Sequence, residues 1–120
     1  MYSNLMRYTK LMKTMVDYIE KLKEMYGLNS YYKAMSYIGM NVQGWTKIKA
    51  GGGISEKNAI RLAQALKIDP IEIMAVSNAL KAENNEIKMV WIKLARQKEE
   101  ERENAKKYGA LLRRKDDIKN

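Results

Sequence analysis

The sequence feature that most constrains this chain is the stretch 30–53, in which a glycine separates two short helical patterns. Ser30 can cap the first helix by accepting a hydrogen bond from a free backbone N–H. Gly39 interrupts the pattern where a residue without a Cβ atom adopts a left-handed backbone easily, and a second helix is predicted over 42–50. Apolar residues recur at helical spacing on one side of both helices, namely Ala34, Ile38, Met40, Trp45 and Ile48.

This arrangement matches the pattern of a helix-turn-helix unit that begins at Tyr31. Met35 departs from that pattern, because its place usually holds alanine or glycine where the two helices cross closely. Gly44 is a second departure, since glycine costs about 1 kcal/mol of helix propensity relative to alanine. The alternative interpretation is an ordinary helical hairpin in a small core. The side of the second helix that faces away from the core carries Gln43, Thr46, Lys47 and Ala50.

Composition argues against several classes of function. The chain of 120 residues contains no cysteine and no histidine, so it lacks thiol chemistry and the commonest acid–base group and metal ligand. No cluster of carboxylates has catalytic or metal-binding spacing, and we expect no enzyme activity, no metal, no cofactor and no small-molecule ligand. No apolar run is long enough to cross a bilayer, and no signal-peptide core is present. We therefore expect a cytoplasmic protein without a membrane partner.

The charge is strongly basic and unevenly distributed. The formal net charge is +9 and the sequence pI is about 9.7. The region 27–66 contains five Lys and Arg residues and one Glu, whereas 67–96 contains five basic and four acidic residues. A polyanionic partner is favoured by this balance, and the excess lies partly in the helix pair, where contact with phosphates would need it.

Two interpretations of the N-terminus are open. One helix can run from about Asn4 to Tyr26, or a first domain helix can begin at Thr14, with Asp17 three residues on as a capping partner. In the second case residues 1–12 form an arm that touches DNA or frays. We favour a helical extension that packs on a partner. The domain that follows is predicted to span 13–84.

The loop and helices after the pair are predicted from turn and cap residues. The triple glycine at 51–53 is either a flexible linker or a loop that brings backbone N–H groups to a phosphate. Asp69 and Pro70 are expected to start a helix that continues to about residue 84, with Glu72 completing a capping box. A helix over 55–66 precedes it, with Ser55 as its expected N-cap. Its expected inward residues are Ala59, Ile60, Leu62, Ala63 and Leu66.

The C-terminal region 85–120 is predicted to be a helical extension. Its first part has one apolar side, which we expect to form the dimer contact; the residues are Ile87, Val90, Trp91 and Leu94. The part 97–120 holds eight basic and six acidic residues, with sparse apolar positions. Such a helix is either solvated or pairs with another chain, and it has too few clean heptads to predict a coiled coil.

The chain resembles the lambda-repressor-like, XRE/Cro type of DNA-binding domain over about residues 14–84. The resemblance rests on YIGMN at the turn, GWTKIKAGGGIS across the second helix and loop, and AIRLAQALKIDPIEIMAV afterwards. It is greatest to small regulators encoded by phages or prophages. The resemblance implies an all-α fold of five packed helices, with the third entering the major groove, followed here by the helical extension.

The resemblance also implies which residues contact DNA. Base edges would be read by Val42 at a thymine methyl, Gln43 at adenine, Lys47 at guanine or a phosphate, and Thr46. The remaining predicted contacts are to phosphates, from Tyr31, Tyr32, Lys33, Asn41, Lys49 and the glycine loop. Of the two adjacent tyrosines we expect Tyr32 to be buried, and we expect Trp45 to belong to the core.

The predicted function is therefore a sequence-specific regulator of transcription that binds double-stranded DNA half-sites as a homodimer. The alternative belongs to another class, a protein-interaction module such as an antitoxin or antirepressor that acts through its terminal helices. In that case Trp91 and the helix over 97–115 would bind another protein, and Lys47 would contribute little.

Overall fold

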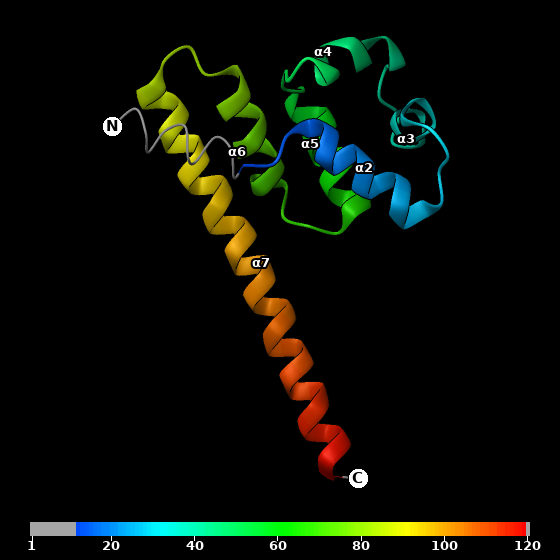
Figure 1. The fold of residues 1–120 in the computed structure, drawn as a ribbon, viewed down its shortest axis with the longest axis vertical. Helices are drawn as coiled ribbons and strands as arrows, with labels where there is room; N and C mark the ends of the chain where they lie inside the picture. The colour runs from blue at the N-terminus through cyan, green and yellow to red at the C-terminus, as the bar shows by residue number, and fades with distance from the viewer. Residues whose placement is uncertain (1–11, 120) are drawn as a thin grey trace.

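The structure, a computed structural model, describes residues 12–119 and is entirely helical in its regular elements over that range (Figure 1). The predicted all-α class is therefore confirmed for the described residues. None of the described helices contains a stretch long and apolar enough to span a bilayer. The elements are α2 (Met15–Tyr26), α3 (Tyr31–Tyr37), the 3₁₀ turn η1 (Val42–Gly44), α4 (Trp45–Lys49), α5 (Glu56–Leu66), α6 (Pro70–Lys81) and α7 (Asn85–Lys119).

The helix α2 begins directly after Thr14, which decides between the two predicted N-termini. The Asp17 carboxylate accepts a hydrogen bond from the Thr14 backbone N–H at 2.7 Å. Residues 12–14 are not helical, so a single helix from Asn4 to Tyr26 is wrong. The predicted arm or extension at 1–12 lies outside the described residues, apart from Met12, which is buried.

The core lies between α2, α5, α6 and the first half of α7. Met15, Ile19, Leu62 and Ile73 from the first three helices are fully shielded from solvent, and α7 adds Ile92. Each such side chain contributes about 1.5–3 kcal/mol when it is removed from water. The segment after residue 84 is therefore packed into the same core as the helices before it.

The predicted caps of α5 and α6 are confirmed. Ser55 accepts a hydrogen bond from the backbone N–H three residues on, at 3.2 Å. Asp69 accepts one from the backbone N–H two residues on, at 2.9 Å, and Pro70 takes the first helical position. The helix α6 ends at Lys81, earlier than predicted, and Asn84 caps the next helix through a 2.9 Å bond from the backbone N–H of Ile87.

Two predictions for this region are wrong: that Ile60 faces inward and that Glu72 completes a capping box. The side chain of Ile60 is 40% exposed, because the buried stripe of α5 runs through Ala59, Leu62 and Ala63 and Ile60 is rotated away from it. Glu72 does not complete a capping box. Its side chain is instead 1% exposed and points into the protein.

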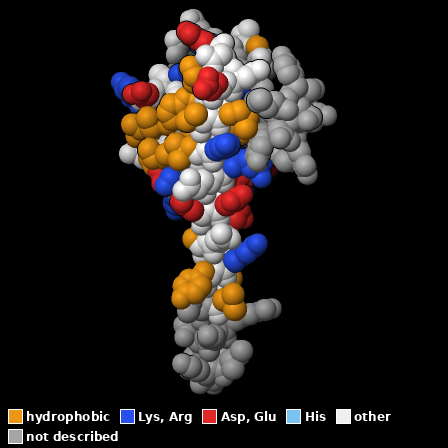
Figure 2. Space-filling view, turned by 90° about the vertical axis from the view of Figure 1, so that its left-hand side faces the viewer, with side chains coloured by type: hydrophobic (Ala, Val, Ile, Leu, Met, Phe, Trp, Pro, Cys, Tyr) orange, Lys and Arg blue, Asp and Glu red, His pale blue; other side chains and the backbone are white. Residues whose placement is uncertain are grey.

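The helix α7 runs without a break from Asn85 to Lys119, through Gly109, and its C-terminal half projects from the body of the molecule (Figure 1). Figure 2 shows hydrophobic side chains over the body and again toward the lower part of this helix, with charged side chains between them. A long helix with few apolar residues of its own needs other contacts to keep its direction.

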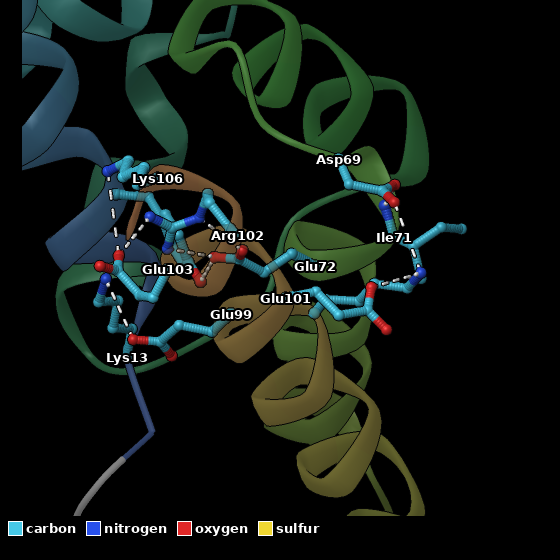
Figure 3. A network of polar contacts seen from close by, with 11 residues as sticks. Lys13, Asp69, Ile71, Glu72, Glu99, Glu101, Arg102, Glu103 and Lys106 are labelled. Carbon is cyan, nitrogen blue, oxygen red and sulfur yellow. Dashed lines mark hydrogen bonds and ion pairs between the residues drawn. The ribbon is translucent and has the colours of Figure 1, made fainter. Parts of the chain in front are cut away.

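These contacts are a network of charged groups around Glu72 (Figure 3). The carboxylate of Glu72 accepts hydrogen bonds from the Tyr18 hydroxyl at 2.7 Å and from Nε and Nη2 of Arg102 at 3.0 and 3.2 Å. Tyr18 comes from α2, Glu72 from α6 and Arg102 from α7. The network therefore joins three helices that are far apart in the sequence.

Weaker ion pairs surround this network. Lys13 pairs with Glu99 at 3.4 Å, and Lys98 pairs with Asp69 at 3.7 Å. Both pairs are partly exposed to solvent and each contributes at most about 1 kcal/mol. The charged segment of α7, which the sequence analysis expected to be either solvated or paired with another chain, is thus held against the body as far as Arg102.

Replacing Arg102 tests the buried network. We expect Arg102→Met to lower the free energy of unfolding by about 3–5 kcal/mol, because it leaves the Glu72 carboxylate buried without a cation. The measurement is urea unfolding followed by circular dichroism. The control is Lys106→Met on the same helix, whose side chain is 64% exposed and which should cost no more than about 0.5 kcal/mol. Equal losses in the two variants would contradict this account.

Because of Tyr18, the stability of the fold should decrease at alkaline pH. Burial, and next the hydrogen bond to Glu72, raise the pKa of Tyr18 far above its usual value. In the unfolded chain the Tyr18 hydroxyl ionises at about pH 10. The stability that Tyr18 contributes to the folded state is therefore complete below that pH and is lost as the pH rises above it. Tyr18→Phe should cost about 1–2 kcal/mol at pH 7, and the difference should shrink by more than about 1 kcal/mol between pH 9 and 11. A constant difference in urea unfolding across this range would refute the mechanism.

Candidate nucleic-acid interface

The predicted pair of short helices is present, and Gly39 makes the turn between them. Gly39 has a φ of 77°, in the left-handed region. Ser30 caps α3 by accepting a hydrogen bond from the backbone N–H of Lys33 at 3.1 Å. The backbone N–H of Met40 then donates to the carbonyl of Met35 at 2.9 Å, which closes the turn. The glycine and the cap were both predicted from the sequence.

The second helix of the pair differs from the prediction of one α-helix over 42–50. Its first turn is the 3₁₀ turn η1, and the α-helix α4 starts only at Trp45. The reason is local: the Asn41 side chain accepts a hydrogen bond from the Gln43 N–H at 3.0 Å, and the Gly44 N–H donates to the Asn41 carbonyl, also at 3.0 Å. A tight i to i+3 bond of this kind is common at the start of helices.

Met35 fits into the core without disturbing this turn. Both Ala34 and Met35 are completely shielded from solvent. The unbranched thioether side chain adapts to irregular gaps, and this explains how a large residue occupies a place that usually holds a small one. Trp45 and Ile48 lie on the core side of the second helix, where Ile48 is fully buried and Trp45 is partly buried.

The side chain of Arg61 on α5 forms a hydrogen bond with the turn at Gly39, a contact that was not predicted from the sequence. Its Nη1 donates to the carbonyl of Gly39 at 3.0 Å. No local pattern identifies this bond, because the two residues are far apart in the chain. The bond also shows that Arg61 contributes to the geometry of the pair as well as to its positive charge.

The outward side of η1 and α4 is polar and open to solvent. All of the residues predicted to contact DNA from this part of the chain are exposed, except Val42, which is half-buried; the exposed ones are Asn41, Gln43, Thr46, Lys47 and Lys49. Lys33 on α3 is also exposed. Of the predicted base-reading side chains, Gln43, Thr46 and Lys47 are thus open to solvent, whereas Val42 packs against the core as Trp45 does.

The two adjacent tyrosines have the opposite arrangement to the one expected. Tyr32 is 55% exposed, whereas Tyr31 is half-buried and stacks on Trp45 with ring centroids 4.3 Å apart. The Nζ atom of Lys23 lies 4.2 Å from the centroid of the Tyr31 ring. A hydrogen bond to Glu20 raises the pKa of Tyr31. Tyr31 is therefore part of the packing between α2 and the helix pair. Its contacts with Trp45 and Lys23 fix the direction of its side chain.

The triple-glycine loop is held by internal hydrogen bonds, which argues against both open interpretations, the flexible linker and the loop that brings N–H groups to a phosphate. The N–H groups of Gly51 and Gly52 donate to the carbonyls of Ile48 and Lys47 at 3.0 and 2.9 Å. A Cβ atom on Gly53 would lie 2.7 Å from Oγ of Ser77, so close packing explains that glycine. The loop serves to end α4 and to bring the chain against α6.

The predicted dimer residues on α7 fall into two groups. Ile87 and Val90 are 45% and 60% exposed, whereas Trp91 and Leu94 are half-buried against the core. The side that α7 turns inward contains Ile92 and Ala95, which the sequence analysis did not select. The apolar side predicted from spacing is thus only partly free.

A groove with a volume of about 860 Å³ lies between α2 and α7. Side chains of both signs line it, including Lys21, Glu24, Lys67 and Glu103. Among the described residues no group of three or more acidic side chains is placed to hold a metal ion. The groove therefore has no single charge preference.

Comparisons with protein-family models, with curated proteins and with solved structures found no match to this chain. The assignment of a function therefore depends on the residues described above.

The two glycines of the helix pair should respond oppositely to alanine. Gly39→Ala forces a Cβ atom into a left-handed backbone, 3.2 Å from Nη1 of Arg61, and should cost about 1–2 kcal/mol. Gly44 has a φ of −72° and open space around its Cβ position, so Gly44→Ala should be neutral or stabilise by up to about 1 kcal/mol. Thermal unfolding of both variants measures the difference; an equal loss would contradict the described turn.

Proposed function

We propose that this protein is a sequence-specific regulator of transcription that binds double-stranded DNA through a helix-turn-helix unit of the lambda-repressor-like type. The observation that carries the proposal is the exposed polar face formed by Gln43, Thr46 and Lys47. Amide and ammonium groups of this kind pair with the edges of adenine and guanine in the major groove. In this proposal η1 and α4 together enter the groove.

The surroundings of this face support the same function. The region 27–66 contains five basic residues and one acidic residue, and of the basic ones Lys33, Lys49 and Lys57 are exposed. Positive side chains beside a reading face position the duplex through its phosphates. Gly44 leaves open space at the start of α4, so a DNA backbone can approach the protein closely there.

We further propose that the protein acts on two half-sites as a homodimer, with α7 supplying the contact between copies. A single unit with so short a reading helix makes few base contacts, and two-fold pairing is the usual way to gain affinity. The resemblance favours a small regulator encoded by a phage or prophage, which works in the cytoplasm where its DNA lies.

Replacing the reading side chains tests the DNA-binding proposal. Fragments that the protein binds are first selected from random duplex DNA. The double variant Gln43→Ala, Lys47→Ala should lose about a hundredfold of its preference for a selected site, since each base contact is worth about 1–3 kcal/mol. Affinity is measured by fluorescence anisotropy, and circular dichroism checks that the helix content is unchanged. The matched control, Gln64→Ala with Lys21→Ala, removes the same side-chain types from exposed positions on α5 and α2.

The salt dependence of binding separates the proposed function from the alternative. Each phosphate contact adds about −0.9 to the slope of log affinity against log salt concentration. A double variant that still discriminates the selected site would show that another surface reads DNA. A flat salt response, or no selected site at all, would instead favour a protein-interaction module.

A further inference from the structure

The unbroken helix α7 shows a regular pattern that its sequence alone left undecided. Positions three and four residues apart form a stripe along its outer side, and the stripe contains Ile87, Val90, Leu94, Gln97, Glu101, Asn104, Tyr108 and Leu111. This spacing is the heptad repeat of helices that pair side by side. Both ends of the stripe are apolar and its middle is polar.

The stripe is exposed except at Leu94, which is half-buried against the core of its own copy and keeps only part of its side chain open to a partner. The opposite side of α7 is already used. Ile92 and Ala95 are buried in the core, and Arg102 is bound to Glu72. On the stripe, Val90 is 60%, Tyr108 66% and Leu111 57% exposed. Large apolar side chains on a projecting helix are costly to leave in water, and Figure 2 shows hydrophobic side chains at the surface toward the lower part of α7.

We propose that α7 pairs in antiparallel orientation with α7 of a second copy of this chain, with Leu94 of each copy packed against Leu111 of the other. In an antiparallel pair, the apolar residues of one stripe that lie near the body face the apolar residues at the projecting tip of the other stripe. The overlap from residue 94 to residue 111 spans about 26 Å of helix at a rise of 1.5 Å per residue.

Charge selects both the orientation and the register. With Leu94 opposite Leu111, Glu100 of each copy lies beside Lys107 of the other, and this favourable pair occurs twice by symmetry. The Glu100 side chain is 68% exposed, with a 4.0 Å ion pair to Arg96 of its own helix, and Lys107 is also exposed. Both side chains can therefore reach a second helix. A parallel pair places Glu101 opposite Glu101. An antiparallel pair shifted by one heptad places Glu100 opposite Glu100 and Lys93 opposite Lys107.

The polar centre of the stripe fits the same register. Glu101 of one copy lies opposite Asn104 of the other, and Gln97 lies opposite Tyr108. A carboxylate can accept a hydrogen bond from an amide in this position. Polar residues at core positions of paired helices weaken the pair but fix its register, so we expect a reversible dimer of moderate affinity.

This inference deepens the homodimer of the proposed function by naming its orientation and its contacts. It extends the contact beyond the residues near the start of α7 to the projecting half of the helix. The test below uses no DNA, so the failure of α7 pairing and the failure of DNA binding are seen in separate experiments.

Charge reversal on the full chain tests the pairing. We expect the unchanged protein to sediment as a dimer in analytical ultracentrifugation. Glu100→Lys and Lys107→Glu should each raise the dimer dissociation constant at least about tenfold, because each variant faces like charges across the pair. An equimolar mixture of the two variants should form a 1:1 heterodimer, and the double variant Glu100→Lys, Lys107→Glu should dimerise like the unchanged protein.

The control is Glu24→Lys, which makes the same charge change at an exposed position on α2 and should leave the dimer unchanged. Circular dichroism confirms that each variant is folded, which is expected because both reversed positions are exposed. A monomeric unchanged protein, single variants that remain dimers, or a mixture that stays monomeric would each overturn the proposal.

Discussion

The carboxylate of Glu72 is the constraint on which the arrangement of the helices depends. It is almost fully buried, and a buried carboxylate is tolerated only when hydrogen bonds and a cation compensate its charge. Tyr18 supplies one hydrogen bond and Arg102 supplies two more together with the positive charge. Because these groups come from α2, α6 and α7, satisfying one side chain sets the relative positions of three helices.

This arrangement separates the two surfaces to which roles are proposed. The helices α2, α5 and α6 form a rigid support for the helix pair, through packed apolar side chains and the bond from Arg61 to Gly39. The same helices also direct α7 away from the body. The proposed DNA-reading face and the proposed pairing stripe thus lie on different elements, so one surface can be altered without altering the other.

Local features of the fold could be predicted because they depend on neighbouring residues. The caps at Ser30, Ser55 and Asp69 and the turn at Gly39 were all predicted, since each needs only a side chain and the backbone within three residues of it. Regular apolar spacing likewise located part of the core, including Ala34, Ile48, Leu62 and Ala63. The candidate site could be predicted to the same extent, because exposed polar residues alternate with Trp45 and Ile48 at helical spacing.

What the sequence by itself determined was therefore the number of helices in 15–81, the approximate extent of those after residue 30, and the polar side of the short pair. Only the tertiary structure decided that Glu72 is buried, that Tyr31 rather than Tyr32 is packed, and which side of α7 faces the core. The physical reason is that each of these outcomes depends on groups distant in the chain, such as Arg102 for Glu72. A helical pattern shows that a side is apolar, but contacts from other helices decide which side is covered.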